Sequence, residues 1–383
     1  MQTLLPRDIV RAAEEETGLA DANGDYLEAL DVLLESYARD ADLTEAGWAK
    51  VTRRLTDALA ARLRTEAAWA THPLPDLPLS PRPVFVTGLP RSGTTALHRL
   101  LTADPRHQGL ELWLAATPQP RPPRSAWADN ADHQRVKADL DRRVAANPGL
   151  NGMHFMAPDV VEECWWLDRQ TFRSWSFPST AHLPTYAAWL AQQDLTPGYE
   201  HHRRALQLIG STEPDRRWVL KNPSHLFALD ALLAAHPDAL VVQIHRDPLS
   251  AIASVSSLTA SSARGTSDAF TPEAIGRWCL DLWADAADRF DRARSNRPAT
   301  SFVDVEYADL LTDPVAVVAR VYDALGVVLD EGAVAAVAAA DEASRQGAAR
   351  PDHRYALADF GLTEAEVAAR FVDRSGHRDL SAR

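Results

Sequence analysis

The 383-residue sequence has few cysteines, no long apolar run and no excess of basic residues, and each shortage narrows what the chain can be. Its two cysteines, Cys164 and Cys279, cannot form a disulfide framework, and no Cys/His pair has zinc-site spacing, so we expect no metal site. No apolar run approaches the ~18 to 20 residues that a membrane-spanning helix needs. Acidic residues lie where a signal peptide would be apolar. We therefore expect a cytoplasmic protein without a membrane span.

Positive charge is also in deficit, with a formal net charge of −13 at pH 7. This balance argues against a nucleic-acid partner, because phosphate backbones favour a basic face. An acidic protein binds a polyanion only through a local basic pocket. Lysine is scarce among the 40 basic residues, at Lys50, Lys137 and Lys221 only. A lysine in a special place is therefore stronger evidence for a site than an arginine.

The first 70 residues have helical periodicity. Apolar residues recur at three- and four-residue spacings, as in Tyr26, Leu30, Leu33 and Tyr37. A proline-rich stretch at residues 71–83 cannot continue a helix and is typical of an extended linker. The sequence thus predicts an N-terminal helical segment over residues 1–80, packed on an α/β domain over residues 81–383.

Within the second part, alternating strand and helix patterns predict an α/β fold with a parallel sheet flanked by helices. Four apolar runs have the length and composition of buried strands: Pro83–Gly88, Trp218–Lys221, Leu240–His245 and Ser301–Tyr307. Helical patterns follow the first three, at Thr94–Ala103, Ser224–Ala235 and Leu249–Leu258. A tryptophan-rich helical insertion at about residues 120–210 separates the first two strands.

The strongest local motif joins the first strand to its helix: Gly88-Leu-Pro-Arg91-Ser-Gly93-Thr94-Thr95. A strand, a turn with two glycines and a helix form a P-loop-type arrangement, in which backbone N–H groups and the helix N-terminus bind phosphate. Nucleotide triphosphatases place a lysine where this chain has Thr94, and the cation here is Arg91. A magnesium-ATP enzyme is disfavoured, although a P-loop small-molecule kinase stays as an alternative.

A second motif ends the third strand at Arg246, where Asp247-Pro248 opens a helix. Ser250 and Ser254 follow on one face of that helix. Arg246 could bind a phosphate bidentately while a serine completes the site. Taken alone, the motif is explained equally well by a capped helix with an arginine in an ion pair.

Together the two motifs resemble the nucleotide site of sulfotransferases that use 3′-phosphoadenosine-5′-phosphosulfate (PAPS), and they are most similar to bacterial members and to tyrosylprotein sulfotransferases. The resemblance implies PAPS as co-substrate, a hydroxyl of a small molecule as acceptor, and adenosine 3′,5′-bisphosphate as product. It implies that the loop residues Arg91, Ser92, Gly93, Thr94 and Thr95 hold the 5′-phosphosulfate. It also implies that Arg246 and Ser254 hold the 3′-phosphate.

Three further segments resemble the family. Lys221 ends a predicted strand, where ligands of open α/β sheets bind, and matches the family's strand-end lysine. Tyr307 matches a tyrosine that lies against the adenine. Near the C-terminus, Arg345, Arg350 and His353 are candidates to complete the 3′-phosphate site, although alanines stand where the family has basic residues.

The acceptor hydroxyl needs a general base within hydrogen-bond reach. Glu111 is the first candidate, because it follows Arg91 at the distance at which tyrosylprotein sulfotransferases carry their catalytic glutamate. His225 is the second, and a third group holds His154 and the pair Glu162-Glu163.

Several tryptophans of the insertion bear on the acceptor: Trp165, Trp166, Trp175 and Trp189. If they line its pocket, the acceptor is apolar or aromatic. A nucleotide-binding module without catalysis is the remaining alternative, and it requires Lys221 and Glu111 to point away from the pocket.

Overall fold

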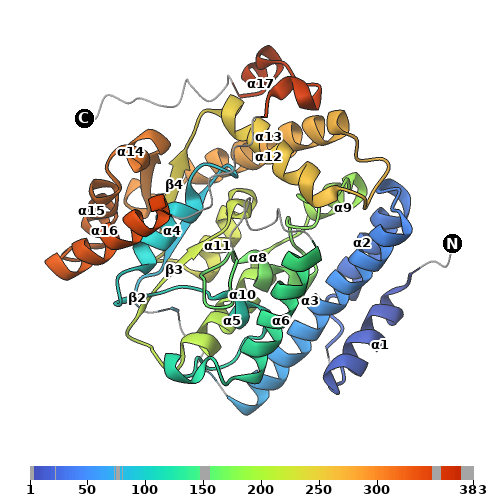
Figure 1. Ribbon diagram of the computed structural model, residues 1–383, viewed down its shortest axis with the longest axis horizontal. Helices are drawn as coiled ribbons and strands as arrows, with labels where there is room; N and C mark the ends of the chain where they lie inside the picture. The colour runs from blue at the N-terminus through green and yellow to red at the C-terminus, as the bar shows by residue number, and fades with distance from the viewer. Residues whose placement is uncertain are drawn as a thin grey trace.

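The computed structural model describes residues 4–21, 23–72, 74, 78–79, 81–146, 156–346 and 355–371 (Figure 1). In this part of the chain a parallel sheet has the strand order β2-β3-β1-β4-β5. Its strands are β1 (Val84–Gly88), β2 (His107–Gln108), β3 (Arg217–Lys221), β4 (Leu240–His245) and β5 (Phe302–Glu306). The four predicted strands and the predicted fold class are confirmed. The edge strand β2 was not predicted, because a strand of two residues is too short to show a hydrophobic pattern in the sequence.

Alternating side chains of each strand point to opposite faces of the sheet and pack against two different layers of helices. Val84 and Val86 of β1 pack with α4 (Thr94–Thr102) and α15 (Pro314–Leu325), and α14 (Tyr307–Thr312) and α16 (Glu331–Gln346) complete that layer. Phe85 points to the opposite face, in the larger core with α10 (Thr196–Gly210) and α11 (Leu229–Ala235). Both faces of the sheet are therefore buried, as parallel sheets require.

The N-terminal helices α1 (Pro6–Thr17), α2 (Leu27–Asp40) and α3 (Glu45–Thr71) lie along one side of the molecule, in blue in Figure 1. They belong to the same apolar core as Phe85. Polar contacts fasten them to the insertion: Arg62 donates to the carbonyl oxygen of Gln170, and Trp69 Nε1 donates to that of Arg204, each at 3.3 Å. This segment therefore packs on the α/β part through both apolar and polar contacts.

The region between β1 and β3 is largely helical, as expected. It contains helices of four to 16 residues and 3₁₀ turns: α5 (Leu112–Ala116), η1 (Arg124–Ala126), α6 (Ala131–Ala146), α8 (Trp165–Asp168), η2 (Arg169–Thr171), α9 (Pro184–Leu190) and α10. Trp175 is buried and stacks on Phe227 with ring centroids 4.0 Å apart.

Elements after β3 follow the predicted order with one difference. The expected helix over Ser224–Ala235 starts instead as the 3₁₀ turn η3 (Pro223–Phe227), because Asn222 caps Ser224 N and Ala228 leaves helical geometry before α11 begins. The remaining elements are α12 (Pro248–Ala263), α13 (Pro272–Arg294), η4 (Ala299–Ser301), η5 (Leu357–Phe360) and α17 (Glu364–Phe371).

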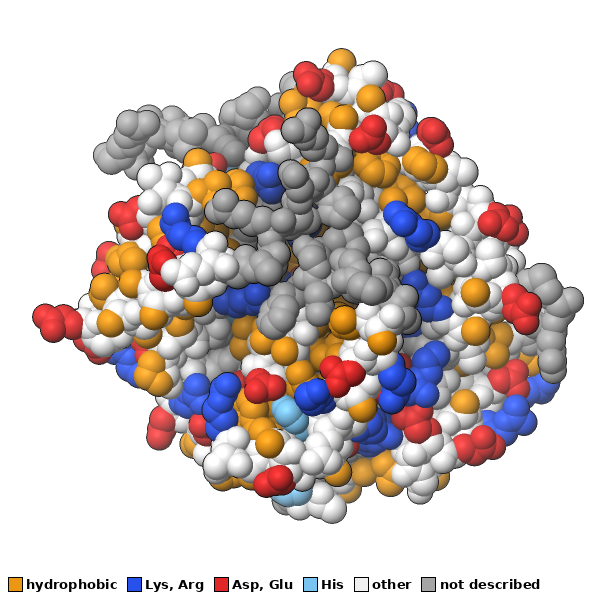
Figure 2. Space-filling model, viewed as in Figure 1, with side chains coloured by type: hydrophobic (Ala, Val, Ile, Leu, Met, Phe, Trp, Pro, Cys, Tyr) orange, Lys and Arg blue, Asp and Glu red, His pale blue; other side chains and the backbone are white. Residues whose placement is uncertain are grey.

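The surface shows how an acidic protein can still present positive charge. Figure 2 shows acidic side chains mainly around the rim of one face, with lysine and arginine side chains nearer its middle. Within the described ranges, no helix combines the length and apolar character that a membrane span demands.

Buried histidines lie under β1. His202, His225 and His236 surround the ring of Phe85, with ring centroids 6.2, 5.3 and 4.9 Å from it. His225 Nδ1 lies 2.7 Å from the hydroxyl of Tyr199. Burial lowers the pKa of His202 to about 3 and moves the pKa of the other two well below the ordinary histidine value. These rings therefore stay neutral in the folded protein near neutral pH.

This cluster predicts acid sensitivity. The unfolded chain binds a proton at each histidine as pH falls through about 6.5, and the folded chain does not, so stability is present above that pH and lost below it. One such histidine lowers the free energy of unfolding by about 1.4 kcal/mol between about pH 7.5 and about pH 5.5. In urea denaturation at both pH values, His202→Phe should shrink the pH-dependent loss by that amount. The exposed-site control His72→Phe should leave the loss as in the wild type; equal losses for all three proteins contradict the account.

Candidate active site

The loop between β1 and α4 has the backbone geometry of an anion site. Arg91 and Gly93 both lie in the left-handed region, with φ of 68° and 90°, and Gly88 has φ of 146°. Ser92 Oγ donates to the carbonyl oxygen of Leu89 at 2.6 Å and holds the turn closed. The loop therefore leads directly into the N-terminus of α4, where backbone N–H groups have no partner within the helix.

Two glycines of this loop are required by space as well as by φ. A Cβ on Gly88 would lie 2.4 Å from the carbonyl oxygen of Ile244 in β4. A Cβ on Gly93 would lie 2.9 Å from the ring of Tyr307. The loop thus packs tightly between the ends of β4 and β5.

The residues predicted for the two phosphate groups form one continuous group. The guanidinium of Arg246 donates to the carbonyl oxygen of Arg91 and lies 4.4 Å from the ring centroid of Tyr307. Arg91 Nε donates to Ser254 Oγ at 3.3 Å, from the loop across to α12. A cation of the loop itself, a cation from the residue after β4 and a hydroxyl from α12 therefore lie together.

Lys221, at the end of β3, lies at the other side of the loop. Its side chain is 1% exposed, its ammonium donates to Thr95 Oγ1 at 3.0 Å, and it forms an ion pair with Glu163. Cys164 N donates to the carbonyl oxygen of Lys221 at 3.0 Å, which fixes the segment that carries Glu163. The structure thus brings together one carboxylate of the third candidate group, the lysine and a loop hydroxyl.

Glu111 has different partners. It caps α5, and its carboxylate forms an ion pair with Arg121 at 2.9 Å; Arg121 also pairs with Glu213 at 3.0 Å. Burial raises the pKa of Glu111. The Glu111 carboxylate is thus held by Arg121 and not by the Lys221 ammonium.

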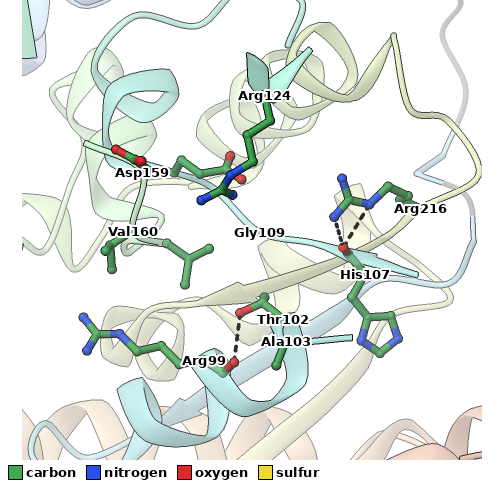
Figure 3. A pocket seen from close by; sticks show the side chains of 11 residues that line it. Arg99, Thr102, Ala103, His107, Gly109, Arg124, Asp159, Val160 and Arg216 are labelled. Atoms are coloured by element: carbon green, nitrogen blue, oxygen red, sulfur yellow. Dashed lines mark hydrogen bonds between the residues drawn. The ribbon is translucent and has the colours of Figure 1, made fainter. Parts of the chain in front are cut away.

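Glu111 also lines a cavity of about 340 Å³ beside β2. Arg99 and Arg124 approach this cavity from opposite sides in Figure 3, and Arg216 donates to the carbonyl oxygen of His107. Thr102 from the last turn of α4 lines it too, whereas the candidate anion-binding loop, residues 89–93, precedes the first turn of α4. The cavity is therefore separate from the loop.

His225 is fully buried in the histidine cluster under β1. Its Nδ1 contacts Tyr199 and its Nε2 has no hydrogen-bond partner. The 3₁₀ turn after Pro223 directs the ring toward Phe85. An acceptor molecule has no exposed surface of this ring to contact.

At the C-terminal side, Arg345 is exposed near the end of α16. It pairs with Asp341 at 2.8 Å, and its Nη2 lies 3.4 Å from the carbonyl oxygen of Leu311, on the helix that begins at Tyr307. Arg350, His353 and His154 lie outside the described residues.

A further pair at the site was not found from the sequence. Asn222 Nδ2 donates to Asp168 Oδ2 at 3.0 Å, and burial raises the pKa of Asp168 to about 7. Asn222 is visible in the motif after Lys221, but no sequence pattern links it to a residue 54 positions earlier. Among the described residues, no group of His, Cys, Asp or Glu is arranged to hold a metal ion.

The fold and the loop define an α/β protein with a P-loop-type fold, with a lysine, two arginines and a carboxylate around the candidate anion site. The model of the sulfotransferase family matches residues 83–331. The chain belongs to this family, which sets aside the kinase, and it is a transferase, which sets aside the non-catalytic module.

Solved structures of two mycobacterial sulfotransferases are similar over nearly the whole chain. STF1 of Mycobacterium tuberculosis H37Rv is 45% identical, with a TM-score of 0.89, and the match covers 97% of this chain and 99% of that one. STF9 of Mycobacterium avium is 26% identical, with a TM-score of 0.87, covering 99% and 98%.

A further relative is named omega-hydroxy-beta-dihydromenaquinone-9 sulfotransferase Stf3, from Mycobacterium bovis and Mycobacterium tuberculosis. It is 27% identical over 252 residues, which is 64% of this chain. The match spans 62% of that relative's length.

The tight packing of the loop predicts the effect of Gly88→Ala. The new methyl group meets the backbone of Ile244 and the residue keeps a φ that side chains disfavour, so the free energy of unfolding should fall by roughly 1–3 kcal/mol. The control Gly332→Ala lies in α16 with its nearest neighbour at 3.4 Å and should be neutral or slightly stabilising. Urea denaturation measures both; wild-type stability in Gly88→Ala means that the loop is not constrained as described.

Proposed function

We propose that the protein transfers the sulfuryl group of PAPS to a hydroxyl of an apolar or aromatic small molecule. The observation that carries the proposal is the contact of buried Lys221 with both Thr95 and Glu163, at the first turn of the helix after the anion-binding loop. A cation, a loop hydroxyl and a carboxylate are the groups that sulfuryl transfer to a hydroxyl calls for.

The residues at the loop fit PAPS in shape and charge. The loop runs from Arg91 through Gly93 into the first turn of α4, whose backbone N–H groups have no partner within the helix and suit the 5′-phosphosulfate. Arg246 and Ser254, already in contact with the loop or its arginine, suit the 3′-phosphate.

Two further groups complete the proposed cofactor site. Tyr307, whose ring face is covered by the Arg246 guanidinium, is proposed to contact the adenine. Arg345, near the helix that Tyr307 begins, is proposed to add positive charge, together with Arg350.

The proposed chemistry is an in-line displacement, in which positioning and charge stabilisation supply most of the rate. When bound, PAPS supplies the sulfuryl group and a leaving group that gains negative charge as the sulfur–oxygen bond breaks. The Lys221 ammonium neutralises that charge, and Thr95 orients the ammonium from one side. Glu163 accepts the proton of the acceptor hydroxyl as the new oxygen–sulfur bond forms.

Accessibility favours Glu163 over the other candidates for the base. Its side chain keeps 20% exposure beside a lysine that is 1% exposed, so an acceptor can approach the carboxylate from solvent. Glu111 is held by Arg121, and His225 is fully buried against Tyr199 and Phe85. Glu163 is therefore the base in this proposal.

An apolar acceptor is favoured by the residues that follow Glu163. Trp165 and Trp166 stack on each other with ring centroids 4.4 Å apart and are both partly exposed. The Stf3 relative is named for a hydroxylated menaquinone, an apolar molecule with a hydroxyl group. A hydroxyl on an aromatic or isoprenoid-like body matches both observations.

The nucleotide proposal predicts selective binding of adenosine 3′,5′-bisphosphate. At a concentration a hundredfold above its dissociation constant, this nucleotide should stabilise the protein by about 2.7 kcal/mol, while magnesium-ATP should not. Arg246→Ala should weaken it by roughly 1.5–3 kcal/mol, or about 10- to 150-fold. The control Arg320→Ala removes a surface ion pair with Asp309 and should bind normally. Titration calorimetry measures the affinity of the wild type and of both variants for adenosine 3′,5′-bisphosphate. An unchanged affinity in Arg246→Ala would mean that Arg246 has a structural role only.

The proposed base predicts a specific kinetic defect. Glu163→Gln should bind adenosine 3′,5′-bisphosphate normally and lose roughly 10²- to 10⁴-fold in single-turnover transfer from preloaded PAPS. Lys221→Ala should also lower turnover more than nucleotide affinity. The acceptor used in this assay is a phenol or a long-chain alcohol that an initial screen finds to be sulfated. A full rate in Glu163→Gln together with a collapse in Glu111→Gln moves the base to Glu111.

A further inference from the structure

The segment that carries Glu163 has little structure of its own. Glu163 lies two residues before α8, a helix of four residues that cannot be stable in isolation. Its position therefore depends on what holds α8 against the sheet. Two contacts to the end of β3 do so: Cys164 N donates to the carbonyl oxygen of Lys221, and Asn222 Nδ2 donates to Asp168 Oδ2, each at 3.0 Å.

Asn222 is itself held rigidly by the centre of the sheet. Its N–H donates to the carbonyl oxygen of Val86 at 3.2 Å, and its carbonyl oxygen accepts from Thr87 Oγ1 at 3.0 Å. Its side-chain oxygen accepts from Ser224 N, also at 3.0 Å. With the oxygen engaged, the amide nitrogen has a single orientation, toward Asp168.

We propose that Asp168 and Asn222 form a clamp that sets the Glu163 carboxylate against the Lys221 ammonium, so that both are positioning residues for sulfuryl transfer. The inference rests on the proposed function, since it takes Glu163 as the base. Asp168 ends the helix that follows Glu163, and Asn222 follows Lys221 directly. Their hydrogen bond thus adds a side-chain link to the backbone link from Cys164 N to Lys221 O, between the two chain segments whose charged groups must meet.

The surroundings of Asp168 allow the clamp to work across neutral pH. Arg169 is the neighbouring cation, and the buried groups Cys164 and Tyr199 lie close to the carboxylate. Burial raises the pKa of Asp168 to about 7. An oxygen of the carboxyl accepts from Asn222 whether or not the group is protonated, so a neutral asparagine of the same shape is a fair replacement.

A reciprocal exchange tests the clamp. Asn222→Asp puts two buried carboxyl groups face to face while an oxygen still caps Ser224. These groups share a proton near neutral pH and have no donor once both are ionised, so we expect single-turnover transfer to fall about 10²-fold toward high pH. Adding Asp168→Asn restores the hydrogen bond with its direction reversed, and should recover most of that rate. Asp168→Asn alone should stay within about threefold of the wild type. Asp168→Leu, which cannot accept the bond, should fall as far as Asn222→Asp.

Two measurements separate positioning from folding. All variants should bind adenosine 3′,5′-bisphosphate within about threefold of wild type, because the loop and Arg246 are untouched. The control Tyr322→Phe removes a buried hydrogen bond to Asp104 on the α15 side, and should lose stability with no loss of transfer rate.

The outcomes distinguish this inference from the proposed function. A slow Glu163→Gln with full rates in Asn222→Asp and Asp168→Leu overturns the clamp alone. A slow double variant that still folds and binds nucleotide also overturns it. A full rate in Glu163→Gln overturns the proposed base instead.

Discussion

The structure depends on one buried charge, the Lys221 ammonium at the end of β3. A cation with 1% exposure is costly unless it is paired and hydrogen-bonded. Thr95 supplies a hydroxyl from the first turn of α4, and Glu163 supplies the opposite charge from the insertion. The sheet, the first turn of α4 and the helical insertion therefore meet at this group, and in the proposed function the same cation stabilises a leaving oxygen.

The parallel sheet explains why the remaining groups meet at the same edge. The carboxyl ends of parallel strands lie together, so the loop after β1, Arg246 after β4 and Tyr307 after β5 join Lys221. Gly88 and Gly93 let the loop approach β4 and Tyr307 more closely than any other residue would. A net acidic protein can in this way concentrate cations around one site.

The features of the fold and of the candidate site that depend on short-range sequence patterns could be predicted from the sequence. The strands, the glycine loop and the strand-end Lys221 and Arg246 follow from local apolar runs, turn residues and helix starts. Glu163 was only one of several alternatives, because it reaches Lys221 across 58 residues of insertion whose path no local pattern describes. Asp168 was missed for the same reason. The orientation of His225 depends on a 3₁₀ turn where a continuous helix was expected.

The central claim is that the groups around Lys221 and Arg246 form one nucleotide site. A crystal structure with adenosine 3′,5′-bisphosphate tests it most directly. The account predicts the 5′-phosphate within hydrogen-bond distance of the Thr95 region and Lys221, and the 3′-phosphate on Arg246 and Ser254. Nucleotide bound elsewhere, such as in the cavity beside β2 that Arg124 lines, with this loop empty, would contradict it.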